Sequence, residues 1–539
     1  MRRLKVLICC TALALFAAGA QAGVMNPIPS DPITTETGKL SGTLLDSGVK
    51  AYLGVPFAAP PVRELRWHEP MPVKPWTGIY NAESKITNCT IPLRATTLNH
   101  YFGELKSSED CLFTNIWVPP GTQKGNKASD KLPVVVWIHG GGFQEGSINF
   151  DVYGGEPLAK KGVIFMGIAY RVNIFGNLAH PELTAASGHN ASGNYGLMDQ
   201  IAGLKWIQRN IAAFGGDPAN VTVVGQSAGA MALDLLQSSP LAHGLYAKMV
   251  AMSGGYHGVA APHLETLAET EAKGVRLQQA MKAKDIAQMR TIPADQIAEI
   301  AKANKIVFTG PTVDGYVVPG NPAAIYAAGK QRDVPLLLSS VGNDIFSKNA
   351  VTDARTLADY KAAAQKLYGP DAPTFLKLFP AKTDAEAAHQ AAAVARISGF
   401  GIVARDWAKA QSATAKSPIW LVQYNHPHPY PPGVVITDMD VKTAGAYHNS
   451  DLPFWYGTLD SLNLYRHIRD WTPYDYKLSN QMQDVLVAFA KTGNPATAEA
   501  PISRYNPKRE QRLVWGDGAP VVETLNPRQV DFIEAHPLR

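Results

Sequence analysis

Ser227 stands between two glycines in the run GQSAG at residues 225–229. This spacing matches the G-x-S-x-G pattern, in which a tight turn from strand to helix exposes a nucleophilic serine. The apolar residues Val221–Val224 predict a strand before the turn, and the residues after it, to about Gln237, predict a helix. The hydroxyl would then lie at a helix N-terminus, where the helix dipole stabilises developing negative charge. The run therefore indicates nucleophilic acyl transfer. The alternative is a glycine-rich turn with an inert serine.

A second glycine-rich run, His139–Phe143, follows the continuous apolar segment Leu132–Ile138. Such a segment is typical of a strand that is buried on both faces. Successive glycines leave backbone N–H groups unobstructed by side chains. We expect the N–H groups of Gly141, Gly142 and Ala228 to bind the oxyanion of a tetrahedral intermediate. The alternative, a loop without a chemical role, is disfavoured because both runs end predicted central strands.

A serine nucleophile needs a base and a carboxylate that orients the base. In chains with this kind of turn the order is serine, acid, histidine. Spacing alone does not choose among the later histidines, but His448 lies in a turn-like stretch beyond the predicted strand Ile419–Tyr424. For the acid, Asp344 follows the predicted strand Val334–Ser339, whereas the alternative, Asp314, precedes it. An Asp next to Gly is often only a turn residue, so both remain candidates.

The elements that must position these residues alternate between strands and helices. Such alternation predicts an α/β fold with a mostly parallel sheet covered on both faces. Two Ala-rich helical stretches, at about 264–304 and 355–397, carry no chemical motif, and we expect them to be insertions that cover the sheet edge. The sequence shows no internal repeat and no long polar linker. We therefore predict a single domain over residues 23–539, although a chain this long commonly divides. Further strands are expected at Val163–Ala169 and Lys248–Met252, and a helix at Leu197–Phe214.

The N-terminal residues indicate export. Positive residues precede the apolar run Val6–Ala18, and Ala20-Gln21-Ala22 supplies a small-x-small cleavage pattern. We predict a signal peptide over residues 1–22, cleaved after Ala22, and a secreted or periplasmic protein. The alternative, a membrane anchor, needs about 20 apolar residues, and this run is shorter. Since Arg2, Arg3 and Lys5 supply much of the net charge of +5, the remaining charge does not indicate nucleic acid or an anionic membrane as a partner.

Four cysteines occur, and Cys9 and Cys10 belong to the predicted signal peptide. In an exported protein the remaining pair, Cys89 and Cys111, is expected to form a disulfide, which would stabilise the fold by roughly 3 kcal/mol. Two buried free thiols are the alternative. The segment His426–Pro432 holds two histidines, but its prolines favour a stiff loop over a metal site, since no third ligand is in view. No metal and no organic cofactor is expected.

Several long motifs, in a fixed order, resemble those of the type-B carboxylesterase/lipase family, which includes cholinesterases and bacterial para-nitrobenzyl esterases. The resemblance extends over nearly the whole chain after the signal peptide. It implies an α/β-hydrolase fold, with a mostly parallel central sheet, flanking helices and large helical insertions. The segments that carry it are Tyr52–Pro61, Leu65–Trp67, Ser108–Leu112, His139–Phe143, Asn194–Gln200, Asn210–Pro218, the turn at Ser227, and Phe489–Pro495.

The resemblance also implies the two partners of the serine. The family pattern G-x-x-H-x-x-[ED]-[LI]-P-[YF] maps onto Gly445–Phe454 and selects His448. The implied acid is Asp344, at a position where family members usually carry Glu. Two residues depart from the pattern: Gln226 stands where Glu is usual, and Ile345 stands where Gly is usual.

The function implied is a serine carboxylesterase that forms an acyl-enzyme intermediate and acts on a small-molecule ester, broadly or with a preference for aromatic or short-acyl esters. We expect a monomer. Phe143, Trp455 and Tyr456 are expected as walls of the substrate pocket. The alternatives are a lipase, a specialised hydrolase of a toxin or plant ester, and a non-catalytic binding module that keeps the fold.

Overall fold

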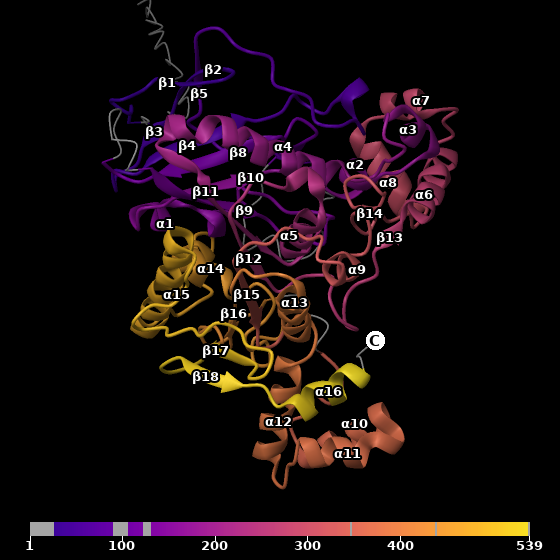
Figure 1. Ribbon diagram of the computed structural model, residues 1–539, viewed down its shortest axis with the longest axis vertical. Coiled ribbons are helices and arrows are strands. Elements are labelled where there is room, and N and C mark those ends of the chain that lie inside the picture. The colour runs from indigo at the N-terminus through magenta and orange to yellow at the C-terminus, as the bar shows by residue number, and fades with distance from the viewer. Residues whose placement is uncertain (1–25, 90–105, 122–130, 345–347, 437–438, 537–539) are drawn as a thin grey trace, which may run out of the picture.

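A mixed sheet runs through the centre of the molecule (Figure 1). The computed structural model describes residues 26–89, 106–121, 131–344, 348–436 and 439–536. From one edge to the other, the strands of the sheet are β18 (Val521–Thr524), β17 (Gln511–Trp515), β16 (Ile419–Tyr424), β15 (Leu336–Val341), β12 (Lys248–Met252), β11 (Gly216–Gln226), β9 (Leu132–Ile138), β10 (Ile164–Ile168), β8 (Phe113–Val118), β4 (Lys50–Pro56) and β3 (Thr43–Leu44). Neighbours from β17 to β10 are parallel, and the outer pairs are antiparallel. The predicted mostly parallel sheet is confirmed.

The central strands are apolar throughout because both of their faces are buried. In β9, alternate side chains point to opposite faces, as the period of a strand requires. Val134, Val136 and Ile138 join one hydrophobic cluster, and Val135 and Trp137 join the other. The sheet therefore separates two cores, each closed by helices.

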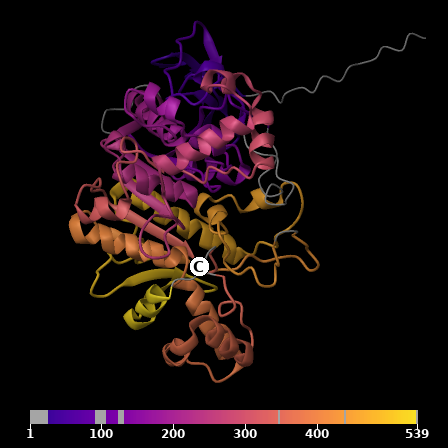
Figure 2. The same cartoon turned by 90° about the vertical axis from the view of Figure 1, so that its right-hand side faces the viewer.

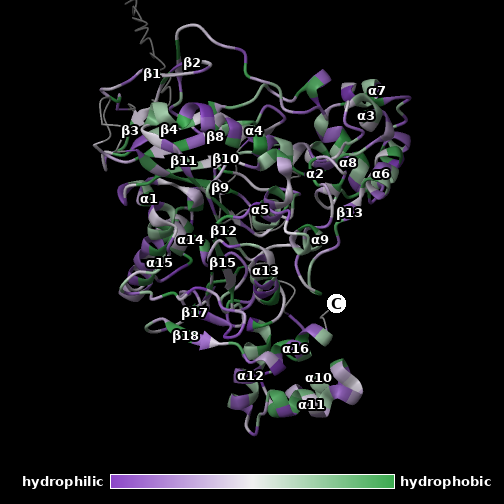
Figure 3. Cartoon of the chain, viewed as in Figure 1, coloured by the Kyte–Doolittle hydropathy of each residue, from purple (hydrophilic) through white to green (hydrophobic). Residues whose placement is uncertain are grey.

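Helices cover both faces of the sheet. They are α1 (Glu156–Lys160), α2 (Asn173–Asn177), α3 (Pro181–Ala186), α4 (Tyr195–Asn210), α5 (Ala228–Ser238), α6 (Leu267–Ala280), α7 (Ile286–Thr291), α8 (Ala294–Ala303), α9 (Pro322–Ala327), α10 (Leu357–Tyr368), α11 (Ala372–Leu378), α12 (Asp384–Arg396), α13 (Phe400–Thr414), α14 (Leu452–Tyr456), α15 (Pro473–Thr492) and α16 (Pro527–Ala535). Buried residues of α4 and α5 belong to one core, and those of α14 and α15 belong to the other. Peripheral helices such as α6 and α15 carry both hydrophilic and hydrophobic residues (Figure 3), as elements with one exposed face should.

The two predicted insertions behave differently. Apolar residues of α6, α7 and α8 join the core that also holds α4 and α5. Helices α10, α11 and α12 instead pack with α16 around a small core of their own. This second insertion projects from the end of the molecule in both views (Figures 1 and 2). The first insertion therefore shares a hydrophobic core with the central strands, whereas the second has a separate small core.

The N-terminal part forms a small separate sheet. From Ile33 onward the chain forms β1 (Ile33–Thr35) and β2 (Gly38–Ser41), which pair with each other, and β2 also pairs with β5 (Ile79–Asn81). Short cross-strand pairing orders this segment despite its Pro- and Thr-rich composition. The predicted signal peptide, residues 1–22, lies outside the described residues.

The predicted disulfide is confirmed, since Cys89 and Cys111 are bonded with their Cα atoms 4.9 Å apart. The two histidines of the proline-rich loop are held by other protein groups. His426 lies between Asp475 and Asp517, at 2.8 and 2.6 Å, and the Nδ1 atom of His428 accepts a hydrogen bond from Arg469. Among the helices of the described residues, none is both long and apolar enough to cross a membrane.

Candidate active site

The turn at Ser227 is strained and closely packed. Strand β11 ends at Gln226 and helix α5 begins at Ala228, so Ser227 alone makes the turn, with φ 56° and ψ −125°. A residue with a side chain rarely adopts positive φ, and such strain is concentrated at functional sites. A Cβ atom at Gly225 would lie 2.6 Å from the backbone of Gly229. Glycine is therefore required at 225 because the strand and the helix approach closely there, and not because of its backbone freedom. The turn presents the serine as the G-x-S-x-G pattern predicts.

The glycine-rich loop after β9 lies directly against this turn. A Cβ atom at Gly140 would lie 3.0 Å from the Cβ atom of Ser227. Gly141 and Gly142 have φ values of 114° and 62°, which favour glycine. In the described part of the chain, their N–H groups donate to no backbone carbonyl outside helices and strands. Ala228 is the first residue of α5, so its N–H has no acceptor within the helix. Three N–H donors are thus available beside the serine.

The acid and the histidine are brought together by pairing between two loops. Asn343 and Tyr447 form a β-bridge, and the N–H of Asn343 donates to the carbonyl of Ala446 at 2.8 Å. The next residue on each loop is Asp344 or His448, and the Nδ1 atom of His448 lies 2.5 Å from the Oδ1 atom of Asp344. Asp344 is buried. Because its carboxylate accepts the Nδ1 proton, the Nε2 atom is the ring nitrogen left for proton transfer.

The alternative acid, Asp314, has a different role. Its Oδ1 atom accepts hydrogen bonds from the N–H groups of Tyr316 and Val318, at 3.0 and 2.8 Å. These bonds are those of an Asp that stabilises a turn. The geometry therefore pairs His448 with Asp344, and Asp314 holds a loop.

Gln226 contacts His448. The sequence indicated this contact only through the departure of Gln226 from the family pattern. The Nε2 atom of Gln226 lies 3.1 Å from the Nε2 atom of His448. With the Nδ1 proton given to Asp344, the amide of Gln226 is the donor and the ring nitrogen is the acceptor. Within the described residues, the hydroxyl of Ser227 makes no hydrogen bond to His448. The Gln226 amide thus occupies the lone pair of Nε2, and Ser227 is the next residue in the chain.

This contact predicts how a charge at position 226 would change the pH dependence. In Gln226→Glu a carboxylate would face the Nε2 atom and stabilise the protonated imidazole, which cannot act as a base. We expect the acid limb of the kcat/KM profile to move upward by about one pH unit. Activity would fall at pH 6 and stay near the wild-type value at pH 9. Gln226→Met is the control, since it removes the amide without adding charge, and its acid limb should keep the wild-type position. An unshifted limb in Gln226→Glu would contradict the contact.

A second carboxyl lies behind the first. Asp451 is buried and accepts a hydrogen bond from the indole N–H of Trp455 at 3.1 Å. Burial, and then the negative charge of Asp344, raises the pKa of Asp451 to about 7. Both effects favour the neutral form of Asp451 over a second carboxylate beside the Asp344–His448 pair.

Two of the three expected pocket residues have core contacts. Trp455 and Tyr456 are completely buried in α14. The ring of Trp455 packs edge-on against Trp515 at 5.5 Å, and Tyr456 packs against Trp137 at 5.2 Å. These contacts give both rings a packing role in place of the expected pocket wall. Phe143, in contrast, belongs to the glycine-rich loop itself.

The chain belongs to the carboxylesterase family, whose model matches residues 29–533. Together with the mostly parallel sheet, this places it in the α/β-hydrolase fold. It is a serine carboxylesterase, an enzyme that hydrolyses carboxylic esters.

The chain is similar to proteins named as esterases over most of its own length and of theirs. The chain is 34% identical to the fumonisin B1 esterase of Sphingopyxis macrogoltabida over 502 residues, which are 89% of this chain and 86% of that protein. It is 32% identical to the para-nitrobenzyl esterase of Bacillus subtilis (strain 168) over 497 residues, which are 89% and 94% of the two chains. Among solved structures, a PNB esterase superposes with a TM-score of 0.74 at 29% identity, covering 93% of this chain and 99% of the other.

Proposed function

We propose that the chain hydrolyses esters through a triad of Ser227, His448 and Asp344. The observation that carries this proposal is the 2.5 Å contact between Nδ1 of His448 and the carboxylate of Asp344. The other ring nitrogen of His448 contacts Gln226, which precedes Ser227 in the chain. Catalytic hydrogen bonds often form only when substrate is bound. On substrate binding, the imidazole turns from the Gln226 amide to the Ser227 hydroxyl.

The reaction then proceeds in two steps. Nε2 of His448 takes the proton of Ser227 while the serine oxygen bonds to the ester carbonyl carbon, and the carbonyl oxygen becomes an oxyanion held by the N–H groups of Gly141, Gly142 and Ala228. The intermediate collapses, the C–O bond to the alcohol breaks, and His448 returns the proton to the alcohol. Water, which gives its proton to His448, then bonds to the acyl carbon; the bond from this carbon to the serine oxygen breaks, His448 returns the proton to Ser227, and the acid leaves. Asp344 fixes the tautomer of His448 and stabilises the imidazolium.

For the substrate, we propose a broad preference that includes aromatic and short-acyl esters. The 32% identity to a protein named para-nitrobenzyl esterase supports this, because the name denotes an ester with an aromatic group. The test is a series of nitrophenyl esters of increasing acyl length together with aromatic esters. We expect kcat/KM to be highest for short acyl groups, and we expect the rate with each ester to saturate while the ester is still dissolved. A rise that begins only above the solubility limit would instead identify a lipase.

A second candidate is a specialised hydrolase of a toxin or plant ester. It is favoured by the 34% identity to a protein named fumonisin B1 esterase. Incubation with fumonisin B1 and mass analysis of the products tests it directly. A kcat/KM for this ester well above that for every nitrophenyl ester would favour the specialised role, and no hydrolysis would favour the broad one.

We also propose that the chain is exported, with cleavage after Ala22, and that residues 23–539 form one domain and one monomeric enzyme. The disulfide between Cys89 and Cys111 supports export, because such bonds persist in oxidising compartments. The intact mass and N-terminal sequence of protein recovered outside the cytoplasm test the cleavage. A product that still begins with Met1 would contradict it.

A further inference from the structure

Residues 305–311 connect the last helix of the first helical insertion to a short strand that follows it. They leave α8 after Ala303 and enter β14 (Thr312–Val313), which pairs with β13 (Glu265–Thr266). We call residues 305–311 the strap. Its side chains alternate in exposure, since Ile306 and Phe308 are buried whereas Val307 is 51% exposed. The strap therefore lies on the body of the enzyme with one side turned inward.

The inner side of the strap contacts the loop that carries the oxyanion donors. The side-chain amide of Gln144, two residues after Gly142, donates to the backbone carbonyl of Phe308. The ring of Phe143 packs so closely on Gly310 that a Cβ atom there would lie 2.8 Å from the Cδ2 atom of the ring. One polar and one apolar contact thus join the strap to the two residues that follow the glycines.

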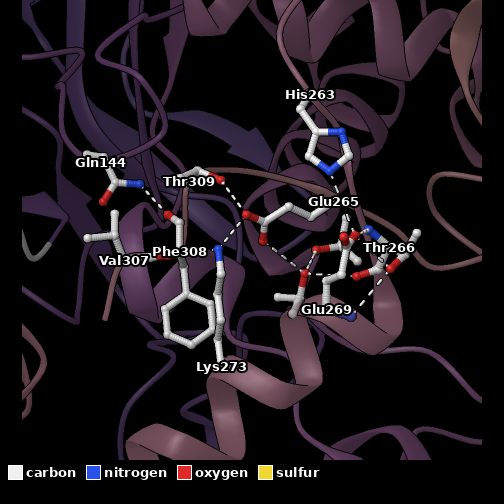
Figure 4. A network of polar contacts seen from close by, with 11 residues as sticks. Gln144, His263, Glu265, Thr266, Glu269, Lys273, Val307, Phe308 and Thr309 are labelled. Atoms are coloured by element: carbon white, nitrogen blue, oxygen red, sulfur yellow. Dashed lines mark hydrogen bonds and ion pairs between the residues drawn. The ribbon is translucent and has the colours of Figure 1, made fainter. Parts of the chain in front are cut away.

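The outer side of the strap is held by an ion pair on the insertion (Figure 4). The ammonium group of Lys273, in α6, contacts the carboxylate of Glu265 and donates to the carbonyl of Val307 at 3.1 Å. The hydroxyl of Thr309 donates to the same carboxylate at 3.1 Å. The side chains of Lys273 and Glu265 are 23% and 17% exposed, so water screens this pair less than a surface pair. In Figure 4 the Gln144 and Glu265 side chains approach the strap from opposite sides.

The next residue along the chain fixes the end of the strap. The side-chain amide of Asn194 donates to the carbonyl of Thr312 at 2.8 Å, and its oxygen accepts the N–H of Thr312 at 2.9 Å. Both residues are completely buried. We call residues 139–144, which include the glycines, the oxyanion loop. On the side away from the strap, α2 holds this loop, since the N–H of Asn173 donates to the carbonyl of Phe143 at 2.6 Å. The loop therefore lies between α2 and the strap.

We propose that the strap holds the oxyanion loop in its working position, with Gln144, Lys273 and Glu265 as positioning residues for the reaction. This inference rests on the proposed function, because it assigns the loop the role of binding the oxyanion. Donors at such a site must be held within a fraction of an ångström, and a displacement of about 1 Å costs up to ~100-fold in rate. In the proposed mechanism none of the three residues contacts the substrate or the reacting atoms.

The test compares transition-state with ground-state binding. Gln144→Met removes the amide that contacts Phe308, and Lys273→Met removes the ammonium that contacts Glu265 and Val307. We expect each to lower kcat by about tenfold and to leave KM within about twofold, since the lost interaction acts only in the transition state. A trifluoromethyl ketone, which forms an oxyanion with the serine, should lose affinity by the same factor as kcat. The matching secondary alcohol, which forms none, should bind as to the wild type.

Two further variants serve as controls. Lys273→Arg keeps the charge and should retain near wild-type kcat. Lys284→Met removes an exposed lysine of the same insertion and should change nothing. If Lys273→Met fails to fold, as judged by circular dichroism, Thr309→Val replaces it, because it deletes one hydroxyl contact only and should lower kcat in the same direction.

The outcomes separate the strap from the triad. Unchanged kcat in both Gln144→Met and Lys273→Met, or in Thr309→Val where it replaces the latter, would overturn the positioning role. Equal losses of affinity for the ketone and the alcohol would also overturn it, because the strap would then be a wall for ground-state binding. An active Ser227→Ala enzyme, measured beside these variants, would overturn the proposed function itself.

Discussion

Ser227→Ala is expected to lose at least about a thousandfold in kcat for any ester substrate, as removal of a triad nucleophile usually does. Without the hydroxyl no acyl-enzyme can form, so the only remaining catalysis is the binding of substrate and oxyanion by groups that stay in place. The fold should persist. The strained backbone of position 227, with φ 56°, is fixed by the packing of Gly225 and Gly229 rather than by the serine side chain. The measurement is the steady-state rate with a nitrophenyl ester, together with the melting temperature.

The matched control is Ser238→Ala at the other end of α5. Ser238 is buried at the last position of α5, and its hydroxyl makes no hydrogen bond within the described residues. This variant should keep the wild-type rate. A rate within tenfold of the wild type in Ser227→Ala would remove the serine from the chemistry.

Asp344→Asn is expected to lower kcat by roughly 10⁴-fold while the enzyme stays folded. Asparagine has nearly the shape of aspartate, so packing in the buried site is preserved. Its amide, however, can donate to Nδ1 of His448 and so favour the tautomer with the proton on Nε2. That tautomer cannot accept the serine proton, and the imidazolium also loses the neighbouring negative charge. The loss should appear in kcat and in kcat/KM alike, because ground-state binding does not involve the carboxylate.

Asp314→Asn is the control for this change, because Asp314 was the other acid that the sequence allowed. Its Oδ1 atom accepts backbone N–H groups, and an asparagine oxygen can accept the same bonds. We expect kcat near the wild-type value. The reverse pattern, with the larger loss in Asp314→Asn, would contradict the assignment of the acid.

Much of the site could be predicted because its chemistry lies in short contiguous runs. The turn at Ser227 and the glycines after β9 need only neighbouring residues to be recognised, and the apolar strands before them fix where both runs lie. The boundaries of β9, β12 and β16 agree with the predicted ones, since fully buried strands produce uninterrupted apolar runs.

What could not be predicted depends on contacts between distant residues. From the residues alone, Asp344 and Asp314 are both aspartates in turns, and only the family resemblance selected Asp344. The bridge of Asn343 to Tyr447, which places Asp344 beside His448, has no local pattern. The aromatic rings of Trp455 and Tyr456 follow the histidine motif closely, but the short helix α14 turns them toward the sheet, where other aromatic rings receive them. The contact of Gln226 with His448 could not be predicted from a local pattern either, since the two residues are 222 positions apart in the chain.

The most direct test of the account is covalent labelling of the purified protein with an organophosphate, followed by proteolysis and mass analysis of the peptide that holds residues 225–229. An activated serine attacks phosphorus and keeps the phosphoryl group, whereas ordinary serines do not react. We predict one adduct per chain, on Ser227, formed in parallel with the loss of esterase activity and absent from Ser227→Ala. Full inactivation with the label on another residue, or no label at all on an active enzyme, would contradict the account.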